Sequence, residues 1–64
     1  MKLETWGMTA WAESKQFSAV KTFKASAPYA DIDDALRELI DEKARKYERW
    51  ITSEDIDYGA PEEL

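Results

Sequence analysis

Apolar and polar residues alternate along two segments near the start of the chain. Over residues 3 to 12, one parity holds most of the apolar side chains: Trp6, Met8, Ala10 and Ala12. Residues 17 to 26 alternate again, with one row made of Phe17, Ala19, Phe23 and Ala25. A two-residue period is typical of β-strands, so the polar residues 13 to 16 between these segments predict an antiparallel hairpin. Gly7 inside the first strand indicates a bulge or a close backbone approach.

The pattern changes to a helical period after Pro28. Apolar side chains then recur at three- and four-residue steps: Ile32, Leu36, Leu39, Ile40, Ala44, Tyr47 and Ile51. This spacing predicts an amphipathic helix from about residue 32 to residue 50, with Asp31 as its N-cap. At 1.5 Å per residue the helix would be roughly 28 Å long. We expect it to be longer than the hairpin, so that its last turns project.

Residues 52 to 64 follow no strong period. Ile56 and Tyr58 alternate with acids, which suits a short third strand but does not require one. Gly59 and Pro61 interrupt any element before them, so residues 59 to 64 are expected to form a mobile acidic tail. The predicted fold is α+β, a single domain of residues 1 to 58 in which an antiparallel hairpin packs on one long helix, in the order ββα or ββαβ.

Composition narrows the classes of function. A chain of 64 residues makes one small domain of marginal stability. It has no cysteine and no histidine, which excludes disulfides, the usual zinc sites and Ser-His or Cys-His nucleophiles. We therefore expect a protein that is not an enzyme and uses no cofactor. No stretch has the length and apolarity of a signal peptide or a membrane span, so we expect a cytoplasmic protein without membrane contact.

The net charge of −5 lies at the C-terminal end of the chain. Residues 1 to 51 balance nine acids with nine bases, whereas residues 52 to 64 hold five acids and no base. Such an extension repels nucleic acid and membrane phosphate, so the expected partner is a protein with a basic groove or surface, such as a nucleic-acid-binding enzyme. Lys15, Lys21 and Lys24 beside aromatic rings suggest a nucleic-acid platform, but the charge argues against direct binding, and edge protection explains them better.

Two acidic runs match metal loops only in part. A calcium loop that began at Asp31 would place Leu36 where an EF-hand needs glycine, and the helical period of this segment contradicts a loop. Helix capping explains these acids better. The run from Asp55 to Gly59 offers only two acids, so we predict no metal site.

The aromatic residues are too many for one hairpin face to bury. Trp6 and Trp11 differ in parity, so a regular strand sends them to opposite faces unless a bulge at Gly7 shifts the phase. Either both enter a compact core, or one tryptophan or an uncovered sheet face stays exposed as a protein interface. The segment from Glu54 to Tyr58 joins three carboxylates to an isoleucine and a tyrosine, a combination suited to Arg or Lys donors beside an apolar pocket. The expected partner-binding residues are Glu54, Asp55, Asp57, Tyr58, Trp6 and Trp11.

These features favour a small, non-enzymatic acidic protein that inhibits or modulates a larger partner. Its carboxylates would occupy a site built for phosphates, as in a DNA mimic. The order of elements over residues 6 to 58 resembles the small proteins that bacteriophages make against host enzymes, such as the ββαβ inhibitor of bacterial RNA polymerase. That resemblance implies action in the host cytoplasm. The alternative is a structural or assembly subunit, such as a homodimer, or an antitoxin-like protein that binds through an exposed aromatic sheet face.

Overall fold

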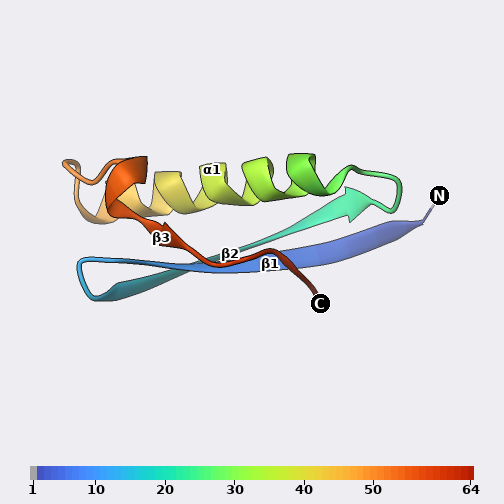
Figure 1. Cartoon of the computed structure of the whole chain (residues 1–64), viewed down its shortest axis with the longest axis horizontal. Coiled ribbons are helices and arrows are strands. Elements are labelled where there is room, and N and C mark those ends of the chain that lie inside the picture. The colour runs from blue at the N-terminus through green and yellow to red at the C-terminus, as the bar shows by residue number, and fades with distance from the viewer. Residues whose placement is uncertain (1) are drawn as a thin grey trace.

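In the computed structural model, one long helix lies across one face of a four-stranded antiparallel sheet (Figure 1). The structure describes residues 2 to 64, so Met1, the first residue of the expected domain, lies outside the described residues. The elements follow in the order β1 (Leu3–Ala12), β2 (Lys15–Lys24), α1 (Tyr29–Tyr47), the 3₁₀ helix η1 (Ser53–Asp55), β3 (Asp57–Tyr58) and β4 (Glu62–Glu63). The predicted α+β fold, a hairpin on one long helix with a short third strand, is confirmed; β4 is an addition.

β1 and β2 pair in one unbroken register, from Leu3 opposite Lys24 to Ala12 opposite Lys15. The turn is shorter than predicted, because it holds only Glu13 and Ser14, whose φ angles are 51° and 64°. Two central residues with positive φ make a type I′ turn. β2 therefore lies two residues earlier than the predicted segment 17 to 26, and β1 has no bulge at Gly7.

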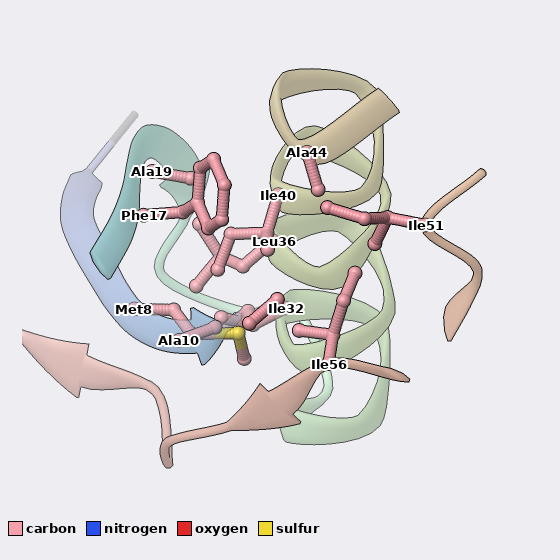
Figure 2. Close-up of a cluster of buried hydrophobic side chains, with 11 residues drawn as sticks. Met8, Ala10, Phe17, Ala19, Ile32, Leu36, Ile40, Ala44, Ile51 and Ile56 are labelled. Atoms are coloured by element: carbon pink, nitrogen blue, oxygen red, sulfur yellow. The ribbon is translucent and has the colours of Figure 1, made fainter. Parts of the chain in front are cut away.

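The regular hairpin sends alternate side chains toward α1, where they form the core (Figure 2). The strands contribute Met8, Ala10, Ala12, Phe17 and Ala19. The helix contributes a stripe at four-residue steps: Ile32, Leu36, Ile40 and Ala44. Ile51 and Ile56, from the segment after the helix, complete the buried cluster. The third strand, β3, therefore begins directly after Ile56, a residue of the buried core.

α1 begins and ends three residues before the predicted range. Pro28 is the N-cap, because its extended backbone turns its carbonyl toward the N–H groups of Asp31 and Ile32, which donate to it. Asp31, the predicted N-cap, lies inside the first turn, where its charge still favours the helix dipole. At the other end, the backbone of Glu48 is extended, and its N–H donates a hydrogen bond to the carbonyl oxygen of Ala44. Tyr47 is half exposed, and its ring packs edge to face on Phe17 of β2, with centroids 5.8 Å apart.

The helix does not outreach the hairpin. Ten-residue strands are about 33 Å long at 3.3 Å per residue, against about 28 Å for the 19 residues of α1. The sheet therefore supports the helix along its whole length, contrary to expectation. No helix in residues 2 to 64 has the length and apolarity needed to cross a membrane.

The C-terminal segment returns along the edge of β1 that β2 leaves free (Figure 1). β3 pairs Tyr58 with Ala10, and β4 pairs Glu62 with Gly7. The three residues 59 to 61 therefore oppose only residues 8 and 9, which places a bulge here, where Pro61 lacks a ladder N–H. The mobility expected of residues 59 to 64 stays a prediction.

Candidate functional site

α1 covers one face of the sheet, and no helix of residues 2 to 64 lies over the other face, here called the open sheet face (Figure 1). Side chains of the second parity project from this face, because successive residues of a strand point to opposite sides. From β1 they are Leu3, Thr5, Gly7, Thr9 and Trp11, and from β2 they are Gln16, Ser18, Val20, Thr22 and Lys24. Their pairing partners Asp57 and Glu62 share the face.

A groove of about 430 Å³ lies on the open sheet face. Its lining includes three large apolar side chains that stay exposed: Trp11 at 47%, Val20 at 59% and Leu64 at 71%. Gly7, Gly59 and Ala60 also line it and add no bulk. Apolar side chains grouped in a hollow, with polar residues around them, are typical of the centre of a protein interface.

Two carboxylates lie on the β3 and β4 side of the groove. Among the described residues, Glu62 is the one charged residue in the lining. Asp57 lies opposite Trp11 in the β1–β3 pairing and so shares its face. On the β2 side, Lys43 Nζ lies 2.5 Å from the carbonyl oxygen of the lining residue Ser18. The apolar hollow is therefore flanked by carboxylates along β3 and β4 and by one ammonium group at the β2 edge.

The free edge of the sheet at β2 is partly closed by side chains. Lys43 of α1 donates a hydrogen bond from Nζ to the carbonyl oxygen of Ser18, at 2.5 Å. Lys15 and Lys21 point to the helix side, where Lys15 Nζ lies 4.9 Å from the centroid of the Tyr47 ring. A lysine on an edge strand discourages pairing with a further strand. The open sheet face is thus better suited to docking than the β2 edge.

Trp6 and Tyr58 lie on the other face, toward α1. The Trp6 ring meets Tyr29 edge to face with centroids 6.1 Å apart, and its Nε1 donates to Glu4 at 3.3 Å. The Tyr58 hydroxyl donates to the Asp41 carboxylate. Burial of the phenol and this hydrogen bond raise the pKa of Tyr58 to about 12. Both residues therefore have their contacts inside the chain.

The two acids of η1 differ in their surroundings. Asp55 accepts hydrogen bonds from the backbone N–H and the hydroxyl of Thr52, at 3.0 Å and 3.1 Å, and completes a capping box. Glu54 is exposed. Asp55 thus stabilises the start of η1, whereas the Glu54 side chain is exposed to solvent.

Of the six expected partner-binding residues, the structure brings Trp11 and Asp57 together and places Trp6 and Tyr58 on the opposite side. Their roles in partner binding stay predictions. The sequence did not predict four residues of the groove: Gly7, Val20, Glu62 and Leu64. A two-residue turn would have placed Gly7 and Val20 on the same face as Trp11, but β4 has no periodic pattern from which it could be predicted.

The helix presents a second acidic surface. Four exposed acids follow one another at three- and four-residue steps on α1: Asp31, Asp34, Glu38 and Glu42. Within residues 2 to 64 there is one ion pair, between Arg37 Nε and Asp33 at 3.2 Å. The described residues contain no group of three or more carboxylates placed to hold a metal ion. Most carboxylates of the chain are therefore not neutralised by its own bases.

Comparisons of the chain with protein-family models, with curated proteins and with solved structures find no match.

Proposed function

We propose that this chain is a non-enzymatic acidic binding protein that engages and modulates a larger protein with a basic surface. The observation that carries the proposal is the exposure of its carboxylates. Exposed acids lie along the helix and again in the C-terminal segment, which contributes Glu54, Asp57, Glu62 and Glu63. A single ion pair joins the described acids to the described bases. These carboxylates are available to Arg and Lys of a partner.

The mode of action follows from charge. A net charge of −5 on 64 residues steers the protein toward basic surfaces and raises the rate of encounter with them. Carboxylates offer negative oxygens to the same Arg and Lys groups that hold phosphates. A protein of this kind inhibits or modulates a nucleic-acid-binding enzyme by occupying its basic groove.

The test compares two forms of the chain as bait. Proteins retained by the wild type but lost by the triple variant Asp34→Asn/Glu38→Gln/Glu42→Gln are purified, and their association rates with each form are measured. Because salt screens exposed charges, the wild-type advantage should be large at about 20 mM salt and vanish near about 500 mM. Lys46→Gln is the control, since it alters an exposed helix residue in the opposite electrostatic sense and should not slow association. Association rates that do not change with salt concentration would contradict the proposal.

A second candidate rests on the exposed apolar residues of the open sheet face. An assembly subunit, a homodimer or an antitoxin-like protein would cover Trp11, Val20 and Leu64 with a partner surface. Such an interface predicts affinity that depends weakly on salt and a melting temperature that rises with protein concentration. Sedimentation at several concentrations separates this candidate from a monomeric acidic binder.

A further inference from the structure

Gly7 stands in the middle of β1 at a position where the fold does not need glycine. Its φ is not positive, and the β1–β2 register passes through it without a bulge. Glycine inside a strand lowers stability relative to a residue with a side chain. Gly59 is the opposite case, because a Cβ there would lie 2.6 Å from the carbonyl oxygen of Thr9. Close backbone approach explains Gly59 and does not explain Gly7.

A side chain at Gly7 would enter the groove of the open sheet face. A Cβ there would lie 3.5 Å from the carbonyl oxygen of Ala19 and 3.6 Å from Val20 Cγ2, which are ordinary contacts. It would lie 3.3 Å from Leu64 Cδ1, the end of a side chain that is 71% exposed and has room to shift. The backbone therefore tolerates a side chain. Glycine therefore leaves the floor of the groove without a side chain, between Val20 and Leu64.

We propose that this groove receives one large apolar side chain from an extended, basic segment of the partner protein. The inference rests on the proposed function and adds a contact surface on the sheet to the acidic surface of the helix. The apolar side chain fits the hollow that Trp11, Val20 and Leu64 line. The basic neighbours fit the carboxylates of Glu62, in the lining, and Asp57, on the same face.

Charge favours such a segment over a second copy of the chain. A symmetric dimer through this face would bring the same patch of both copies together, and with it Asp57 and Glu62 of each. Like charges facing each other oppose association, and each copy already has a net charge of −5. The groove is also open along the sheet surface, whereas small-molecule sites enclose most of their ligand. A protein segment is therefore the occupant that fits best.

The experiment uses the full chain and an immobilised positional-scanning array of ten-residue peptides as the probe. The wild type should retain peptides that carry one large apolar residue next to Lys or Arg. Gly7→Val adds a β-branched side chain to the groove floor and must displace the exposed Leu64 side chain, so circular dichroism first checks that the variant is folded. The affinity of the best peptide should fall at least about tenfold in this variant, the loss expected when one well-packed side chain is excluded.

Thr22→Val is the matched control, because it adds an apolar group to the same face outside the groove lining. It should change the affinity by less than about twofold, as expected of a substitution outside an interface. If Gly7→Val proves unfolded by circular dichroism, Gly7→Ala replaces it, since one methyl group needs only the movement of the Leu64 side chain.

The remaining outcomes overturn the inference in distinguishable ways. Equal binding of the best peptide to the wild type and a folded Gly7 variant rejects the groove. Retention of basic peptides without an apolar preference rejects the groove but leaves the acidic binding function standing. Retention of apolar peptides without a basic preference rejects the inference too, and the acidic binding function is then decided by the salt dependence of the triple helix variant. Retention of no peptide rejects the inference, and a dimer that Gly7→Val dissociates would identify a second copy as the occupant.

Discussion

The hydroxyl of Tyr58 donates a hydrogen bond to the carboxylate of Asp41 and thereby ties β3 to α1. The guanidinium of Arg37, one helical turn before Asp41, lies 4.7 Å from the centroid of the Tyr58 ring. Arg37 is held in turn by Asp33. A strand of two residues has little ladder of its own, so these side-chain contacts from the helix help to fix the C-terminal segment along β1.

Tyr58→Phe should lower the free energy of unfolding by about 1 to 2 kcal/mol, because it removes a hydrogen bond to a carboxylate and keeps the ring. Chemical denaturation near neutral pH measures the loss. Asp41→Asn is the companion variant, since it weakens the acceptor and should be less destabilising in the Tyr58→Phe background than in the wild type. Additive effects of the two changes would show that the pair is not coupled.

Burial of the Tyr58 phenol and its hydrogen bond to Asp41 predict a loss of stability at high pH. The pKa of Tyr58 is raised from 10.0 to about 12, so the native protein holds the phenol proton more tightly than the unfolded chain does. The resulting stabilisation is complete below the unfolded value and disappears as pH rises through the folded one. The stability difference between wild type and Tyr58→Phe should therefore narrow between about pH 10 and pH 12. A difference that stays constant over that range would contradict the assignment.

Burial along α1 predicts a ranking of core substitutions. Leu36 is fully buried, so Leu36→Ala should cost about 2 to 5 kcal/mol, most of the stability of so small a domain. Leu39 is only partly buried, and Leu39→Ala should cost about 1 to 2 kcal/mol. Urea midpoints of the two variants measure the order. A larger loss of stability for Leu39→Ala than for Leu36→Ala would mean that α1 faces the sheet with a different side from the one described.

The fold could be predicted where the pattern of apolar residues is decided by burial on one face. The alternating rows of β1 and β2 and the stripe from Ile32 to Ala44 both follow from that condition. Boundaries failed where backbone geometry decided them. The carbonyl of Pro28 capped the helix without help from the Asp31 side chain, and Glu13 and Ser14 adopted a turn for which their residue types give no signal.

The candidate site was less predictable, because it depends on pairing between distant parts of the chain. Trp11 and Asp57 share a face only through the β1–β3 register, which local periodicity does not specify. Leu64 reaches the groove because its backbone N–H donates to the carbonyl of Thr5, at 2.8 Å. Backbone hydrogen bonds of this kind cannot be predicted from the spacing of apolar residues.

The hairpin turn offers a route to a more stable chain. Glu13 and Ser14 occupy the left-handed region, which disfavours residues other than glycine, asparagine and aspartate. The double variant Glu13→Asn/Ser14→Gly should raise the stability by about 1 to 2 kcal/mol, or the melting temperature by about 5 to 10 °C. Glu13→Gln is the control, because it removes the charge and leaves the backbone preference unchanged. Equal gains in both variants would attribute the effect to charge rather than to φ.

The two glycines of the chain should respond differently to the same substitution. Gly59→Ala places a methyl group 2.6 Å from the carbonyl oxygen of Thr9, so the C-terminal segment must move away from β1. Gly7→Ala needs only a shift of an exposed leucine side chain. Hydrogen exchange should therefore show faster exchange at the Leu64 amide in Gly59→Ala and little change in Gly7→Ala. Equal exchange in both variants would mean that β4 is not held through Gly59.

Asp55 and Asp57 carry the same charge two residues apart, but the structure gives them separate roles. Asp55 closes the capping box on Thr52, whereas Asp57 is exposed on the open sheet face opposite Trp11. Asp55→Asn should thus lower stability by about 0.5 to 2 kcal/mol, as the loss of a cap does. Asp57→Asn should leave the denaturation midpoint near that of the wild type and slow association with a basic partner at low salt, because the lost charge no longer steers the encounter. Because both variants remove one negative charge, each is the control for the other. Equal slowing by both would mean that only the total charge matters, and that the open sheet face has no special part in binding.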